Sequence, residues 1–192
     1  MGMKKMFVVV FLIVVVSVMA AQPFGVRMGN TIMNLVMLGC NPTLLDGESY
    51  IYEITPRKPS LPYKTYFAYI SKTYGVYRIV GVSDIMFCGQ DGAKLKDTFY
   101  AARKQLNATY GKSENKDYLM KGSAWNKPKD WMMALYKNER VLSSCWESFY
   151  GSRLPEDIGK IILGAEALTS LSGRILVIFD SVNADKAEAE ME

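Results

Sequence analysis

Side chains that alternate between two faces recur along residues 49–55, 63–71, 76–83 and 131–136, and no other pattern in the sequence narrows the choice of fold as far. Successive side chains of an extended strand point to opposite faces of a sheet, so this period of two predicts strands. Short connections join most of these strands to the next, which favours antiparallel pairing. The predicted strands are residues 49–55, 63–71, 76–83, 131–136, 141–149, 158–168 and 174–179.

Two other segments show the helical period. Over residues 92–110 the apolar side chains recur at steps of four, three, four and four, and Gly111 follows where a helix commonly ends. A shorter helix is predicted over residues 31–38, because Asn30 or Thr31 can accept a hydrogen bond from a free N–H of its first turn. The apolar face of the longer helix consists of Leu95, Phe99, Ala102, Leu106 and Tyr110.

The order of the predicted elements is α-β-β-β-α-β-β-β-β. Runs of strands with helices set apart from them indicate an α+β fold. We expect a single domain over residues 21–183, with two possibly related halves, 21–90 and 91–183, that each begin with a helix and continue as a sheet. Outside these elements, residues 24–26 are expected to be extended, 112–130 to form a loop with a short strand near 118–120, and 184–192 to be a frayed, charged tail.

Residues 1–20 have the composition of an export signal. Lys4 and Lys5 precede an unbroken apolar run, and Val18 and Ala20 are small enough for positions −3 and −1 of a cleavage site after Ala20. The run is shorter than the roughly 20 apolar residues that a membrane-spanning helix needs. The sequence therefore predicts a signal peptide, and the alternative is an uncleaved N-terminal anchor.

Export places the mature chain in the periplasm or outside the cell, with no membrane span after cleavage. Leu38-Gly39-Cys40 has the residues of a lipoprotein cleavage motif, but it lies too far beyond the apolar run to act as one. Cleavage removes two lysines and no acid, which leaves 21 basic and 19 acidic residues and lowers the net charge from +4 to +2. A nucleic-acid partner, which requires a basic patch and a domain pI above about 9, is not expected.

The chain has three cysteines, and an exported protein can form disulfides. Cys40 follows a helix-ending glycine and Cys88 precedes Gly89 in a predicted loop, so these two form the candidate bridge. Cys145 lies in a predicted strand and is expected in the core. The odd number leaves at least one thiol free or paired between chains. The alternative is three buried thiols that pack as small apolar side chains.

Histidine is absent from the sequence, which excludes Ser-His-Asp and Cys-His catalysis and every histidine-containing zinc site. The chain also lacks a Cys-x-x-Cys motif and a glycine-rich phosphate loop. We therefore predict no catalytic residue, no metal site and no cofactor. Paired carboxylates for glycoside hydrolysis stay open as an alternative, although solvated outer faces are the simpler interpretation. The acids on or beside predicted strands are Glu48, Glu53, Glu147 and Glu166.

Aromatic side chains crowd the predicted sheets, and tyrosines on both faces would leave some rings near solvent. Exposed aromatic residues are common anchors of protein interfaces. The alternative is aromatic packing across strands, which stabilises the sheet itself. The candidate interaction residues are Tyr52, Tyr66, Tyr69, Tyr77 and Trp125.

Short motifs give the chain a resemblance to known proteins. Phe24-Gly25 to Gly29, a short helix ending in Leu38-Gly39, and a second helix ending in Tyr110-Gly111-Lys112 resemble those of small, uncharacterised exported bacterial proteins. Their helix-then-antiparallel-sheet units look like those of the outer-membrane assembly lipoprotein and β-lactamase-inhibitor class. The resemblance implies a fold and an address in the bacterial envelope, and it brings no catalytic residues.

We expect an exported, non-enzymatic protein of the bacterial envelope that binds a protein or a small ligand. One alternative is a hydrolase that uses paired carboxylates. The other is a structural envelope factor held at the membrane by an uncleaved signal.

Overall fold

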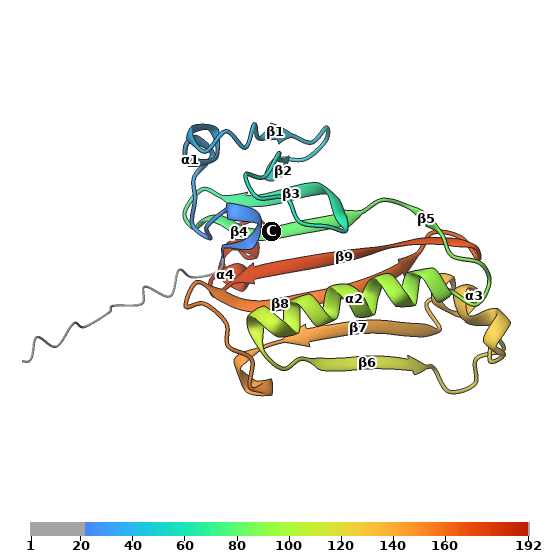
Figure 1. Cartoon of the computed structure of the whole chain (residues 1–192). Helices are drawn as coiled ribbons and strands as arrows, with labels where there is room; N and C mark the ends of the chain where they lie inside the picture. The colour runs from blue at the N-terminus through green and yellow to red at the C-terminus, as the bar shows by residue number, and fades with distance from the viewer. Residues whose placement is uncertain (1–21, 192) are drawn as a thin grey trace, which may run out of the picture.

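The computed structural model describes residues 22–191, in which nine antiparallel strands form one sheet (Figure 1). The predicted signal peptide, residues 1–20, lies outside the described residues. The strands are β1 (Thr43–Leu44), β2 (Ile51–Glu53), β3 (Tyr63–Ser71), β4 (Gly75–Ser83), β5 (Met86–Phe87), β6 (Glu114–Leu119), β7 (Arg140–Trp146), β8 (Ile158–Ala167) and β9 (Ser172–Ser181). The helices are α1 (Ile32–Met37), α2 (Ala93–Tyr110), α3 (Trp131–Tyr136) and α4 (Ala184–Glu188), with 3-10 turns η1 (Pro23–Gly25), η2 (Pro128–Asp130) and η3 (Ser148–Tyr150).

The strand order is β1-β2-β3-β4-β9-β8-β7-β6, and β5 pairs with the start of β9. Two meanders, β1 to β4 and β6 to β9, thus meet side by side at β4 and β9. Their junction is in register from Arg78 opposite Asp180 to Val82 opposite Leu176. The predicted α+β class with antiparallel pairing is confirmed.

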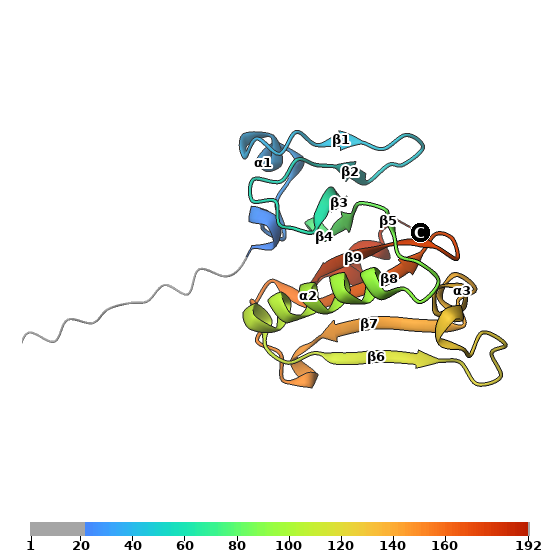
Figure 2. The ribbon, with the colours of Figure 1, turned by 45° about the vertical axis from the view of Figure 1, so that its right-hand side comes forward.

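Both predicted helices are present. Thr31 caps α1: its hydroxyl accepts a hydrogen bond from the Asn34 N–H at 3.2 Å, while Asn34 Oδ1 accepts one from the Thr31 N–H at 2.9 Å. The longer helix, α2, crosses one face of the sheet over β8 and β9 (Figures 1 and 2). Its predicted apolar face is confirmed, with Leu95, Phe99, Ala102 and Tyr110 buried and Leu106 half-buried.

The face of the sheet under α2 is the core face. This face is almost completely shielded from solvent. In a row of directly opposed residues on five neighbouring strands, each side chain is at most 3% exposed. The row consists of Ala68, Ile79, Phe179, Ile161 and Trp146. Below Trp146 the core continues to α2, where Asn107 Oδ1 accepts a hydrogen bond from the indole N–H at 3.1 Å.

The strand predicted over residues 131–136 is wrong, because this segment is helix α3. Trp131, Met132 and Leu135 are buried and follow a helical spacing, whereas Met133, which alternation placed beside Trp131, is only half-buried. A turn beginning at Pro128 leads directly into the helix. Over six residues the two periods share too many positions for alternation to distinguish them.

Three further predictions need correction. The strand predicted near 118–120 is the longer strand β6, which begins at Glu114. Its first residues are polar because β6 is an edge strand, whose side chains largely face solvent. Residues 23–25 form the 3-10 turn η1, in which Phe24 takes a positive φ of 53° and turns its ring into the core. The tail is not frayed over its whole length, since α4 buries Ala184 and Ala187 against Tyr77.

The predicted Cys40–Cys88 bridge is not formed, because all three cysteines are free thiols. Cys40 is tied to β2's end through the Thr55 N–H, and Cys88 is tied to the β8–β9 connection through the Leu171 C=O. Strands β3 and β4 lie between β2 and β9, and adjacent strands are about 4.8 Å apart. A disulfide needs Cα atoms within roughly 7 Å, so the strand order separates the pair.

Candidate functional site

The face of the sheet opposite the core face is also apolar along its centre. Residues in direct register with one another point to the same side, and they alternate with those of the core face. We call this surface the open face and define it by Phe67, Val80, Val82, Cys145, Ile162, Leu176 and Ile178. All seven side chains are half-buried, so each reaches solvent.

One row of residues across the open face can be compared directly with the row on the core face. Phe67, Val80, Ile178, Ile162 and Cys145 stand opposite one another on β3, β4, β9, β8 and β7. Every member of the matching row on the core face is buried, with α2 over β8 and β9, whereas these five residues are half-buried. Helix α4 packs at the β3–β4 end, where Ala187 lies against Tyr77. The whole row is about 20 Å wide, since five strands spaced about 4.8 Å apart span that distance.

Charged side chains frame the open face and pair with one another. The guanidinium of Arg78 contacts Asp180 at 2.5 Å and Glu188 of α4 at 2.6 Å. Lys160 Nζ lies 2.8 Å from Glu147 Oε1, and its hydrogen bond lowers the pKa of that carboxyl. At the far end Arg174 Nε lies 2.7 Å from Glu166 Oε2. Opposite charges therefore offset one another at three places around the apolar centre of the face.

Cys145 is the one thiol on the open face. Burial, helped by the neighbouring Glu147 carboxylate, raises the pKa of Cys145 to about 11. A thiol with this pKa stays protonated at neutral pH and is a poor nucleophile. Cys145 therefore contributes apolar surface rather than reactivity.

The structure does not gather the predicted interaction aromatics into one patch. Tyr66 is 3% exposed, and its hydroxyl donates to the Tyr63 C=O at 3.0 Å within the core. Tyr52 is half-buried and packs against the core cluster. Trp125 is half-buried in the connection after β6.

Only Tyr69 and Tyr77 lie together, with ring centroids 6.1 Å apart at one end of the open face. Tyr77 is 1% exposed because α4 covers it. Tyr69 is half-buried, and the Arg78 guanidinium lies 5.7 Å from its ring centroid. These two rings therefore pack under α4 and take little part in the accessible surface.

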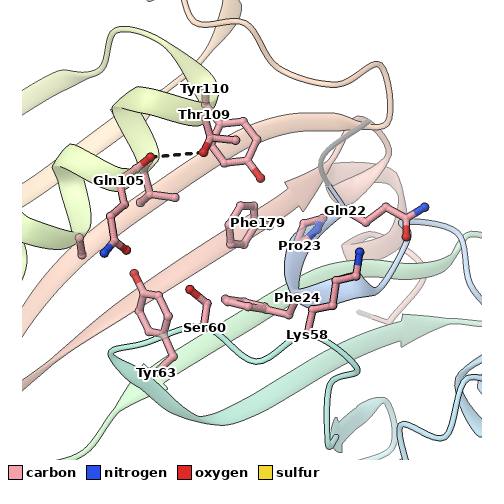
Figure 3. A pocket seen from close by; sticks show the side chains of 12 residues that line it. Gln22, Pro23, Phe24, Lys58, Ser60, Tyr63, Gln105, Thr109, Tyr110 and Phe179 are labelled. Atoms are coloured by element: carbon pink, nitrogen blue, oxygen red, sulfur yellow. Dashed lines mark hydrogen bonds between the residues drawn. The ribbon is translucent and has the colours of Figure 1, made fainter. Parts of the chain in front are cut away.

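A groove of about 200 Å³ lies on the core side, between η1, the loop before β3 and the second half of α2 (Figure 3). Aromatic rings form its floor: Phe24 packs edge-on against Tyr63 at 5.7 Å and Phe179 at 5.6 Å, and Tyr110 lies 6.0 Å from Phe179. Lys58 and Gln105 are exposed at its rim. We name this the aromatic groove.

Tyr63 contributes an unusual group to the aromatic groove. Its side chain is 6% exposed, and within residues 22–191 no atom forms a hydrogen bond with its hydroxyl. Burial raises the pKa of Tyr63, so the phenol keeps its proton. The groove thus contains a hydrogen-bond donor without an acceptor.

The described residues hold no group of three or more histidine, cysteine, aspartate or glutamate side chains placed to bind a metal ion. Among residues 22–191, no helix has both the length and the apolar composition to cross a membrane.

Comparisons of the chain with protein-family models, with curated proteins and with solved structures gave no match. The two candidate sites therefore rest on their own geometry. The aliphatic open face does have a signal in the sequence, although aromatic content does not indicate it. Ile161-Ile162-Leu163 and the run from Ile175 to Phe179 are apolar at every position, which is unusual in an antiparallel strand with one face in water.

Proposed function

We propose that this chain is an exported, non-enzymatic protein of the bacterial envelope that binds a partner protein through the open face. The observation that supports it is the apolar row from Phe67 to Cys145, whose members are half-buried although the matching row on the core face is at most 3% exposed. An exposed apolar patch that is surrounded by polar or charged residues is typical of an interaction site.

The chemistry of the open face favours one kind of partner. Arg78, Lys160 and Arg174 are each paired with a carboxylate, so a strongly charged partner would have to break these pairs to gain contacts. The apolar face of one sheet can pack against the apolar face of another. The expected partner therefore presents an uncharged apolar face of a sheet or a helix.

The export signal predicted over residues 1–20 supports the envelope address. In the alternative role, an uncleaved signal would hold the chain at the membrane as a structural factor. N-terminal sequencing of the exported protein distinguishes the two. We expect a start at Ala21 or Gln22, and a start at Met1 would replace the proposal by the anchored form.

The hydrolase alternative needs two carboxylates about 5 to 10 Å apart, one of which has a raised pKa. Three pockets in the described part of the chain are each lined by at most one acid. The pKa of Glu147 is lowered by the Lys160 hydrogen bond, and that of Glu190 by the Ser71 hydroxyl. These observations support binding over hydrolysis.

The test is affinity capture from an extract of the cell envelope, followed by mass spectrometry. The bait is the purified protein, compared with the double variant Val80→Thr and Ile162→Thr. Threonine keeps the β-branched shape of a strand residue while it removes apolar surface from the centre of the open face. We expect one enriched protein with the wild type and about tenfold less of it with the double variant.

Val182→Thr is the matched control, because Val182 is 59% exposed just after β9 and outside the open face. Circular dichroism confirms that each variant is folded. Equal capture by the wild type and the double variant would overturn the proposal. A homodimer that the double variant dissociates would also overturn it, since the occupant would then be a second copy.

A further inference from the structure

We infer that the aromatic groove binds a small carboxylate whose remainder is an apolar ring or a short chain. The groove lies on the opposite side of the sheet from the open face, so this inference does not depend on the proposed function. Its basis is the set of side chains from η1, the loop before β3, β9 and α2 that meet there (Figure 3).

The unpartnered phenol of Tyr63 is the first argument. A buried donor without an acceptor costs free energy, and native proteins retain few of them. Figure 3 shows the hydroxyl directed toward the α2 side of the groove. A ligand oxygen in the groove is the acceptor that Tyr63 lacks.

The charge of the lining is the second argument. Lys58 is exposed at the rim and forms no ion pair with any of residues 22–191. None of the twelve lining residues is acidic. Burial, and after it the charge of Asp157 outside the lining, raises the pKa of Tyr110, so this second phenol of the lining also keeps its proton. A phenol donor and an ammonium outside any ion pair, in a lining that contains no acid, favour an anionic ligand.

The volume and the lining of the groove indicate what the ligand carries besides its carboxylate. A cavity of roughly 150 Å³ holds benzene, so the volume of about 200 Å³ has room for one ring with a carboxylate. Phe24, Phe179 and Leu106 supply apolar and aromatic contacts. Edge-on packing of a ligand ring against these aromatic rings would continue the arrangement that they already have with one another.

The groove is preorganised by bonds that do not involve a ligand. The Tyr66 hydroxyl accepts from the Ser60 N–H at 3.0 Å and donates to the Tyr63 C=O at 3.0 Å, which holds the loop before β3. The Lys58 N–H donates to the Phe24 C=O at 3.0 Å and fixes η1 to the same loop. Because both walls are held in place, binding requires little ordering of the protein.

The test consists of separate titrations of the protein with benzoate, hexanoate and benzyl alcohol. NMR chemical shifts and calorimetry monitor binding in each titration. It uses protein purified from cells that express the full sequence. Ligands of this size commonly bind with dissociation constants near 1 mM, so a titration to about 10 mM is sufficient. We expect benzoate to shift the resonances of Tyr63, Leu106 and Phe179, and benzyl alcohol to bind about tenfold more weakly.

Tyr63→Phe should weaken benzoate binding about tenfold. It should also stabilise the ligand-free protein, because it removes a buried donor that has no acceptor. Lys58→Met should weaken binding about threefold. Tyr52→Phe and Lys64→Met are the matched controls outside the groove lining, and they should leave binding unchanged.

Three results would each overturn the inference: no chemical-shift change at the groove, equal affinity for benzoate and benzyl alcohol, or unchanged benzoate affinity of Tyr63→Phe. None of these results would bear on the open face, because capture of a partner protein there depends on other residues.

Discussion

The ring of Phe24 crosses the sheet directly over Gly81, and this contact ties η1 to β4. A Cβ atom at Gly81 would lie 2.9 Å from the Phe24 ring and 3.2 Å from Tyr63, which is closer than side chains normally approach. Glycine is needed here for space, because the backbone itself is ordinary strand. Glycine at this position therefore leaves room for two of the rings that line the aromatic groove.

Gly81→Ala should destabilise the protein by about 1–3 kcal/mol through overpacking. Gly164 offers the control, since a Cβ there would meet Leu176 on the open face at an ordinary 3.8 Å. Gly164→Ala should leave the free energy of unfolding unchanged or slightly raised. Urea unfolding of the two variants measures the difference. Equal stability of both would contradict the packing described for Phe24.

The ion pair between Glu147 and Lys160 makes stability depend on pH. Because Lys160 lowers the pKa of folded Glu147, its contribution is fully present above the unfolded value of about 4.3. It is lost as the pH falls through the folded pKa. The pH profile of the free energy of unfolding should therefore be less steep in this acid range for Glu147→Gln than for the wild type. Glu156→Gln, an exposed control, should keep the wild-type slope.

At the scale of elements, the C-terminal helix α4 is a structural part of the sheet. Ala187 is fully buried against Tyr77, Glu188 pairs with Arg78, and the Ser71 hydroxyl donates to Glu190 at 2.6 Å. Only five residues are helical, so an isolated segment of this length would not be stable. Packing on β3 and β4 maintains it.

Ala187→Glu should therefore release α4 and destabilise the protein by about 1–3 kcal/mol. Lys186→Glu, on the exposed side of the same helix, should change stability by less than about 0.5 kcal/mol. Tyrosine accessibility to chemical iodination reports the release, since Tyr77 is 1% exposed only while α4 is docked. Equal protection of Tyr77 in both variants would show that another element covers it.

Long periodic segments were predictable from the sequence, and short ones were not. Helix α2 repeats its apolar spacing over 18 residues, so chance agreement with another period is small. The six residues of α3 fit alternation and helix almost equally well, and tertiary packing of Trp131 and Leu135 decided the outcome. The cap of α1 was predictable because Thr31 and Asn34 interact only locally.

The candidate sites were less predictable than the fold. Sequence reasoning selected aromatic residues, but Tyr66 became core and Tyr77 was covered by α4. Which face of a strand stays uncovered depends on where helices pack, and this is not encoded within the strand itself. The groove at Tyr63 joins segments that are distant in sequence, so no local pattern could indicate it.

At the scale of the whole molecule, the two sequence halves share one sheet and one core. Strands β4 and β9 join them in register, and Phe24 from the first half packs at 5.6 Å from Phe179 of the second. Separating the halves would leave both β4 and β9 with an unpaired edge and an uncovered apolar face. Such edges pair readily with other chains.

Residues 22–90 and 91–191 expressed separately should each lack a cooperative unfolding transition, and mixing them should restore one. Urea titrations followed by near-ultraviolet circular dichroism of each half and of the mixture measure this. A sigmoidal transition of either half alone would show that it folds as an independent unit.

The two apolar faces have a consequence for how β8 and β9 find their alignment. In most antiparallel sheets a shift by one residue exposes the apolar side chains, which penalises the error. Here Ile161-Ile162-Leu163 would be apolar on the core face after such a shift as well as before it. The charged residues at the strand ends, Asp180 and Lys160 near one end and Arg174 and Glu166 near the other, would instead be forced inward. Correct alignment therefore depends on excluding a few charges from the core rather than on burying the many apolar residues between them.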